Sequence, residues 1–113
     1  MTCLKKHKSS LKEYQIIRIN LAFNFAQCLE KERRCSEALV YIQMAEELSL
    51  NSFEQALLPE IEFGRAKICH LLGNDKECTA ILKAIVPYMK LVHKTEFAEI
   101  VCDYAEKELG LII

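Results

Sequence analysis

Residues 19–48 read INLAFNFAQCLEKERRCSEALVYIQMAEEL, and their pattern of large and small residues returns forty positions later in the chain. At that offset the matched pairs are Leu21 with Ile61, Phe23 with Phe63, Ala26 with Ala66, Ala38 with Cys78, and Ile42 with Leu82. Within each set the residues are spaced as on one face of a helix. A repeat of this length is typical of stacked helical units. The sequence therefore predicts an all-α fold, a short right-handed superhelix of antiparallel helices with two repeat units and a C-terminal capping helix.

Few Gly and Pro residues interrupt the chain, and apolar residues recur at helical spacing along most of it. We expect five helices, over about residues 11–31, 36–50, 53–72, 75–89 and 94–109. Ser36 and Asp75 are candidate N-caps for the second and fourth of these helices. Ser52 with Gln55 is a candidate capping box for the third.

The two prolines make the ends of two helices harder to place. Pro59 leaves two alternatives for the third helix. The helix could start near Phe53 and bend at Pro59, or a turn could precede a helix that has Pro59 in its first position. We favour the bent helix. Pro87 lies near the end of the fourth helix, where it is expected to distort or end it.

The first expected helix carries two apolar stripes. One consists of Leu11, Tyr14, Ile17, Leu21, Phe25 and Leu29, and the other of Ile16, Ile19, Phe23 and Ala26. A helix with two apolar stripes contacts neighbours on two sides, as an internal helix of a solenoid does.

The charge balance of the chain is close to neutral. It has 15 Lys and Arg against 16 Asp and Glu, a net charge of −1, and a pI of about 6.3. A nucleic-acid-binding domain is usually basic, so we expect no direct nucleic acid contact. We interpret the basic cluster at residues 5–8 as a solvated end, with an anionic partner as the alternative. The sequence contains neither an apolar run long enough to span a membrane nor the apolar core of a signal peptide. We therefore expect a cytoplasmic protein without membrane contact.

The six cysteines show no CxxC pair and no zinc-ligand spacing. Cys28, Cys69, Cys78 and Cys102 lie in apolar helical runs, where free cysteine behaves as a small hydrophobic residue. We expect reduced, structural cysteines, no metal and no cofactor. Because the sequence also lacks a phosphate-binding loop, a nucleophile elbow and an HExxH motif, we expect a protein that is not an enzyme.

Residues 19–52 resemble a tetratricopeptide repeat. Ala26, Ala38 and Ala45 fill its three small positions, and Leu29 and Ile42 fill two of its large ones. The longer repeat unit is similar to those of bacterial regulators that sense signalling peptides, and equally to those of large scaffolding assemblies.

The second unit matches the repeat more loosely than the first. Glu62 and Arg65 stand where the motif has apolar residues, and we expect them to pair three residues apart on one helix face. The resemblance implies that residues 1–113 are a single helical-repeat domain, or a fragment of a longer solenoid.

The resemblance also implies a concave groove that binds a peptide or protein segment. By register, its residues are Asn20, Phe23, Asn24, Gln27, Phe63, Lys67 and His70, with Glu60 beside them. Asn and Gln side chains offer both a donor and an acceptor to a peptide backbone. The alternative for the two phenylalanines is that they are core residues. Since Phe23 occupies the lysine position of the repeats that clamp a C-terminal carboxylate, we expect no preference for a free C-terminus.

A structural role is the second hypothesis. Residues 1–10 fall, by register, on the tail of a preceding helix, and the last helix lacks a mate. The apolar end of the chain would then form a homodimer through the C-terminal helix and tail, with Tyr104, Leu111, Ile112 and Ile113 as oligomerisation residues. A third reading, the ligand-sensing part of a transcription regulator, requires a DNA-binding domain outside this sequence.

Overall fold

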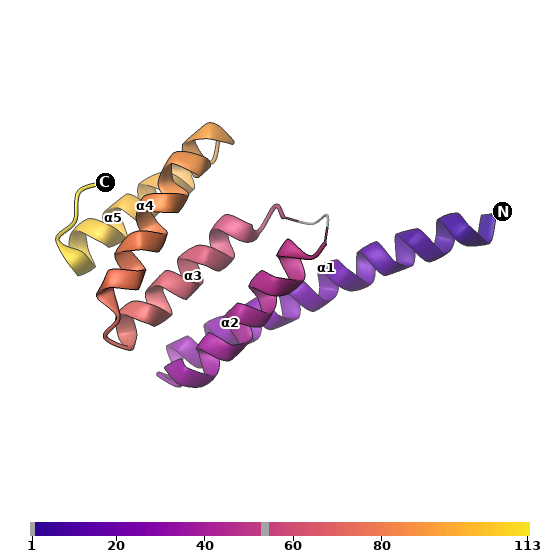
Figure 1. The fold of residues 1–113 in the computed structure, drawn as a ribbon, viewed down its shortest axis with the longest axis horizontal. Helices are drawn as coiled ribbons and strands as arrows, with labels where there is room; N and C mark the ends of the chain where they lie inside the picture. The colour runs from indigo at the N-terminus through magenta and orange to yellow at the C-terminus, as the bar shows by residue number, and fades with distance from the viewer. Residues whose placement is uncertain (1, 53–54) are drawn as a thin grey trace. The chain divides into compact units, whose positions relative to one another are not determined.

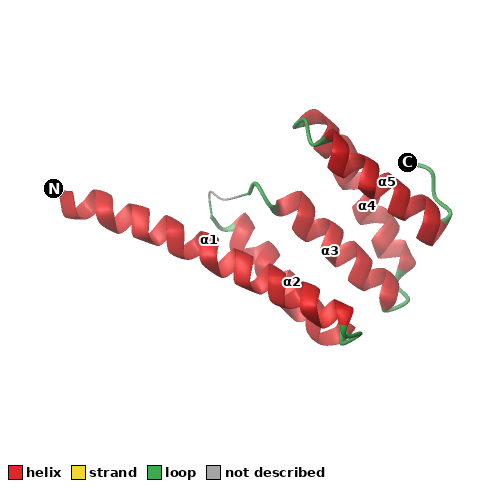
Figure 2. Cartoon of the chain, turned by 180° about the vertical axis from the view of Figure 1, so that it is seen from behind, coloured by secondary structure: helices red, strands yellow, loops and turns green. Residues whose placement is uncertain are grey.

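The computed structural model describes residues 2–52 and 55–113, with side chains from residue 12 onward. These residues form five α-helices and no strand (Figures 1 and 2). The helices are α1 (Thr2–Lys31), α2 (Cys35–Leu50), α3 (Leu58–Leu71), α4 (Asp75–Leu91) and α5 (Thr95–Leu109). The predicted all-α fold of five helices is confirmed. The chain divides into two compact units, residues 1–61 and 62–113, and each is described by itself. The superhelix that would join the units stays a prediction.

The first unit is built on the hairpin of α1 and α2 (Figure 1). Its seam consists of small residues, and Ala26, Ala38 and Ala45 are completely buried. Small side chains allow two helix axes to approach closely, and the larger Ile42 then fills the space beside the seam. The predicted small positions therefore lie where the two helices of this hairpin pack.

The second unit consists of the part of α3 from Glu62 onward, with α4 and α5. Its core includes Ala66, Cys78, Leu82, Val101 and Ala105, all completely buried. Helices α4 and α5 pack against each other, and aromatic contacts connect α3 to α5. The unit therefore buries an apolar face of each of its helices.

Three interhelical turns share one hydrogen-bonding pattern. At the end of α1, the backbone N–H of Arg34 donates to Leu29 and that of Arg33 donates to Glu30, at 2.9 and 3.0 Å. The turn after α3 repeats these bonds around Gly73, and the turn after α4 repeats them around His93. Residues 33, 73 and 93 all have positive φ, of 63°, 86° and 63°. This is the Schellman motif, in which one left-handed residue satisfies the last carbonyls of a helix.

Several predicted helix ends were wrong. α1 begins at Thr2 and runs without interruption, so residues 2–10 belong to the same helix as residues 11–31. The turn residue Arg34 is the N-cap of α2, in place of Ser36, and makes no side-chain cap bond. The N-cap of α4 is Asn74, whose side chain accepts a bond from the N–H of Glu77, so Asp75 is the first helical residue.

The favoured bent helix at Pro59 was also wrong. α3 begins at Leu58, so Pro59 lies in the first turn, where its missing N–H leaves no intrahelical bond unmade. Ser52 is not the N-cap of α3, because that helix begins six residues later, at Leu58. Its hydroxyl donates to the carbonyl of Ser49 in α2. Residues 53 and 54 of the predicted helix lie outside the described part of the chain. Pro87 does not end α4, which continues to Leu91.

Candidate functional site

Four large apolar side chains of α1 are exposed to solvent. Tyr14, Ile17, Leu21 and Phe25 are 57, 55, 65 and 49% exposed. Their spacing of three, four and four residues places them on one side of the helix, over about three turns. We call these four residues the apolar face of α1. The sequence predicted a helix with neighbours on two sides, but the structure buries Ile19 and Ala26 of the other stripe and leaves this face uncovered.

The apolar face of α1 continues into a pocket on the hairpin. Leu21 and Phe25 of α1 and Tyr41, Met44 and Leu48 of α2 line it, together with Ala22 and Arg18. The cavity has a volume of about 350 Å³, which is at the lower end of the range of small-molecule sites and is enough to receive one or two large side chains. Five of its seven lining residues have entirely apolar side chains. We call this cavity the hairpin pocket.

Aromatic contacts hold two sides of the apolar surface in place. The rings of Phe25 and Tyr41 meet edge to face, with centroids 4.6 Å apart and planes at 84°. The guanidinium carbon of Arg18 lies 5.6 Å from the centroid of the Tyr14 ring. Such T-shaped and cation–π contacts favour fixed ring orientations. The surface is therefore partly preorganised for an apolar ligand.

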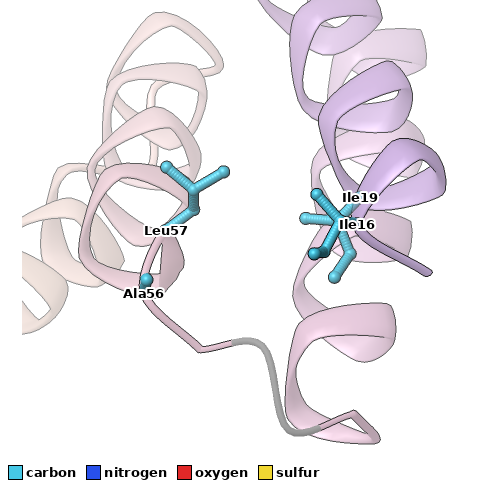
Figure 3. A pocket seen from close by; sticks show the side chains of 4 residues that line it. All are labelled: Ile16, Ile19, Ala56 and Leu57. Carbon is cyan, nitrogen blue, oxygen red and sulfur yellow. The ribbon is translucent and has the colours of Figure 1, made fainter. Parts of the chain in front are cut away.

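A second cavity of the first unit is too small to be a binding site. Ile16 and Ile19 of α1 and Ala56 and Leu57 before α3 line a cavity of about 30 Å³ (Figure 3). This volume is comparable with that of one water molecule, and the lining side chains offer no polar group to hold one. We interpret it as a packing gap.

The first four predicted groove residues lie on a different side of α1 from its apolar face. Asn24 is exposed, and Asn20, Phe23 and Gln27 are partly buried. At 100° per residue, this set is centred more than a quarter-turn away from the line through Leu21 and Phe25. The four residues do share one side of the helix, as predicted.

The other predicted groove residues lie in the second unit, where Phe63 is a core residue. Only 8% of Phe63 is exposed, and its ring contacts those of Phe97 and Tyr104 of α5 edge to face, at 5.6 and 5.3 Å. The Nζ of Lys67 lies 4.8 Å from the centroid of the same ring. Phe63 is therefore a core residue, which is the alternative that the sequence left open for the two phenylalanines. A groove joining it to residues of the first unit stays a prediction.

His70 lies between two carboxylates near the end of α3. Its Nδ1 is 2.6 Å from the Oδ1 of Asp75, and its Nε2 is 3.7 Å from an oxygen of Glu108 in α5. Its ring also lies edge to face with that of Tyr104, at 6.2 Å. These contacts connect the end of α3 with the start of α4 and with α5. We therefore interpret His70 as a residue that joins the three helices of this unit.

The predicted pair of Glu62 and Arg65 is confirmed. The Nη2 of Arg65 donates to Glu62 at 3.0 Å, and its Nη1 donates to Glu77 of α4 at 3.2 Å. The second contact was not predicted, because it depends on how α4 packs beside α3. The charged residues that depart from the repeat motif therefore connect two helices.

The predicted oligomerisation residues divide into packed and exposed ones. Tyr104 contacts Phe63 and His70, as described above. The N–H of Leu111 donates to the carbonyl of Ala105, which helps to end α5. The thiol of Cys102 lies 3.8 Å from the carbonyl oxygen of Ile113. Between them, Ile112 is 89% exposed, whereas Leu111 and Ile113 are partly buried.

The described cysteines are free, and they differ in exposure. Cys28 is exposed, whereas Cys69 and Cys78 are buried. Burial raises the pKa of the Cys69 thiol and raises that of Cys78 to about 11, so both remain protonated at neutral pH. A protonated, buried thiol is a poor nucleophile, so neither thiol is suited to covalent chemistry.

Comparison of the chain with protein-family models, with curated proteins and with solved structures found no match. Among residues 2–52 and 55–113, no helix combines the length and apolar character needed to cross a bilayer. The same residues contain no group of three or more His, Cys, Asp or Glu side chains placed to hold a metal ion. The candidate site of this chain is therefore the apolar face of α1 with the hairpin pocket, identified from its own geometry.

Proposed function

We propose that this chain is a non-catalytic interaction module that binds a helical segment of a partner protein on the apolar face of α1 and in the hairpin pocket. The observation that carries the proposal is the exposure of four large apolar side chains beside a cavity of about 350 Å³. Contiguous exposed apolar surface of this kind usually marks an interaction site. A helix that inserts apolar side chains into a groove is a common way to cover it.

The chemistry of the pocket favours a helix over an extended peptide. Among its lining residues, only Arg18 and Tyr41 have polar side-chain groups. An extended peptide would bring backbone N–H and C=O groups against this surface without hydrogen-bond partners. A helix satisfies these groups internally and presents only side chains. The apolar face of α1, about 16 Å long from residue 14 to residue 25, matches three turns of such a helix.

The repeated turns support the further proposal that the chain is a tetratricopeptide-like solenoid. Residues 33 and 73, which are forty positions apart, have positive φ and the same pair of helix-ending bonds. In proteins of this class, concave and lateral surfaces bind peptides and partner helices. If the chain is such a solenoid, the predicted groove at Asn20, Asn24 and Gln27 is a second peptide-binding surface.

Binding of a model helix tests the proposal. The probe is a fluorescein-labelled 18-residue amphipathic peptide with leucines at positions i, i+3, i+4 and i+7 and uncharged glutamines elsewhere. We expect saturable binding by fluorescence anisotropy that Leu21→Ser weakens at least tenfold. Leu91→Ser is the matched control, since Leu91 is 77% exposed, against 65% for Leu21, but lies in α4. Absence of binding, or equal loss in both variants, would refute the proposal.

Assembly through the C-terminal end is a second candidate function, favoured by the exposure of Ile112 and Ile100. We propose that these side chains contact another copy of the chain. Sedimentation over a dilution series would show a dimer that Ile112→Ser dissociates. A monomer at every concentration would exclude this function and leave helix binding unaffected.

A further inference from the structure

We infer that the helix bound by the apolar face of α1 is acidic, with Asp or Glu residues beside its apolar stripe. This inference rests on the proposed function and specifies the chemistry of the partner. It is carried by the distribution of charge over the chain, by the position of Arg18, and by the poor fit of a second copy to the same surface.

The near-neutral net charge hides a strong asymmetry. Residues 1–34 contain eight Lys and Arg and three Glu, a net charge of +5. Residues 35–113 contain seven Lys and Arg and thirteen Asp and Glu, a net charge of −6. The helix with the exposed apolar face is therefore the basic part of an otherwise acidic protein. Such a field attracts an acidic partner and discriminates against a basic one.

The charge of Arg18 lies within the proposed binding surface. Arg18 is exposed, lines the hairpin pocket and lies over the ring of Tyr14. It follows Tyr14 by four positions and precedes Leu21 by three, so it lies on the same side of α1. A carboxylate of a partner helix that packs on Leu21 would lie within reach of its guanidinium group. An arginine that stacks on an aromatic ring keeps its outer N–H donors available for such a bond.

One acidic residue of α2, Glu37, is already paired within the chain. Arg34 holds it through two bonds, from Nε to Oε1 at 3.0 Å and from Nη2 to Oε2 at 2.6 Å. Both partners lie at the end of the hairpin where α1 gives way to α2. Among the residues that line the hairpin pocket, Arg18 is the one that carries a charge.

A second copy of the chain fits this surface poorly. If two copies paired antiparallel about the centre of the apolar face, between Tyr14 and Phe25, Arg18 of each copy would lie opposite position 21 of the other. The two Arg18 positions would then be three residues apart along the contact, about 4.5 Å at 1.5 Å per residue. Like charges this close are unfavourable. A foreign helix with an acidic residue at this point would instead meet the favourable charge of Arg18.

The length of α1 extends the surface available to such a partner. α1 has 30 residues and α2 has 16, and the N-terminal turns of α1 continue past the end of α2 (Figure 1). An anionic membrane would also attract a basic apolar helix. A pocket lined by side chains of both helices favours inserted side chains over a flat bilayer.

Charge-matched peptides test the inference. Three 18-residue probes share one leucine stripe and differ only in their flanking residues, which are all Glu, all Gln or all Lys. We expect the Glu peptide to bind about ten times more tightly than the Lys peptide at 50 mM salt. Each exposed charge pair changes the binding free energy only slightly, but the effects of several pairs add up to about a tenfold change in Kd. This preference should shrink at 300 mM salt, because salt screens exposed charges.

Substitutions at Arg18 test whether the preference for the Glu peptide arises at the apolar face of α1. Arg18→Glu should abolish it, and Arg18→Lys should retain most of it, with circular dichroism confirming that both variants are helical. Leu21→Ser should weaken binding of all three peptides equally. Equal binding of the Glu and Lys peptides would overturn the inference but leave the proposed function standing. Binding of none of them would overturn both.

Two further measurements test whether a membrane or a second copy of the chain binds the apolar face of α1 instead. Vesicles of phosphatidylcholine with 30% phosphatidylserine should bind more weakly than the Glu peptide. Tighter binding to vesicles that is lost in Leu21→Ser would overturn the inference in favour of a membrane. Sedimentation should show no self-association that depends on Leu21, and a dimer that Leu21→Ser dissociates would overturn it in favour of a second copy.

Discussion

Replacing Gly73 by alanine and Arg33 by glycine should change the stability of the protein in opposite directions. Both residues have positive φ, at 86° and 63°, in turns with the same hydrogen bonds. A residue with a Cβ atom loses about 1–2 kcal/mol in this conformation. Glycine escapes this loss, but its greater freedom in the unfolded chain costs about 0.4–1 kcal/mol. The difference predicts that Gly73→Ala destabilises the protein by about 1 kcal/mol and that Arg33→Gly stabilises it by a similar amount.

The structure makes this a test of the backbone alone. A Cβ atom at position 73 would have no other heavy atom within 4 Å, so alanine introduces no clash. Arg33 is exposed, so its removal disturbs no core contact. His93 has the same φ as Arg33 and is also exposed, so His93→Gly should repeat the gain.

Urea denaturation followed by circular dichroism at 222 nm measures these changes. With a slope of about 2 kcal/mol per M, a change of 1 kcal/mol moves the midpoint by about 0.5 M. Lys83→Gly is the control, because glycine at an exposed position inside α4 should cost about 1 kcal/mol. If Arg33→Gly destabilised the protein as much as Lys83→Gly does, the assignment of left-handed turns would be refuted.

Three other predictions concern the second unit. Phe63→Ala should lower the free energy of unfolding by about 3–4 kcal/mol, because it removes a buried ring that contacts Phe97 and Tyr104. A loss of less than about 1 kcal/mol would show that Phe63 is not a core residue. Asn74→Ala should cost about 1 kcal/mol through loss of its cap bond to the N–H of Glu77, whereas an unchanged urea midpoint would contradict that bond. The buried thiol of Cys78, with its pKa raised to about 11 from 9.0, stabilises the fold fully below pH 9 and loses this contribution as pH rises toward 11. The urea midpoint should therefore fall over this range, less so in Cys78→Ala, and an identical fall in both would remove Cys78 as the cause.

The helices could be predicted from the sequence because their signals are local. Apolar spacing placed all five, and the small residues Ala26, Ala38 and Ala45 were recognised as helix-packing positions that are completely buried. The pair of Glu62 and Arg65 followed from their separation of three residues. Helix ends were less predictable, because the left-handed residue Arg33 is not of a type that usually indicates a turn.

The candidate site could be predicted only in part. The stripe of Tyr14, Ile17, Leu21 and Phe25 was visible in the sequence as an apolar side of a helix, but nothing in its spacing showed that it would be exposed. The pocket residues Tyr41, Met44 and Leu48 were not predicted as site residues. Their position beside Leu21 and Phe25 depends on the rotation of α2 about its own axis, which is set by packing at the seam.

The sequence by itself determined that the chain is helical, where its helices lie along most of their length, and which small residues let them approach. These properties depend on neighbours within a few positions. Tertiary structure decided that Ile19 and Ala26 of one apolar stripe of α1 are buried while Tyr14, Ile17, Leu21 and Phe25 of the other are exposed. Both stripes are apolar, and only the position of the packed helices distinguishes them. It also decided that Phe63 is a core residue, since α5, more than thirty residues away in sequence, supplies the rings that cover it.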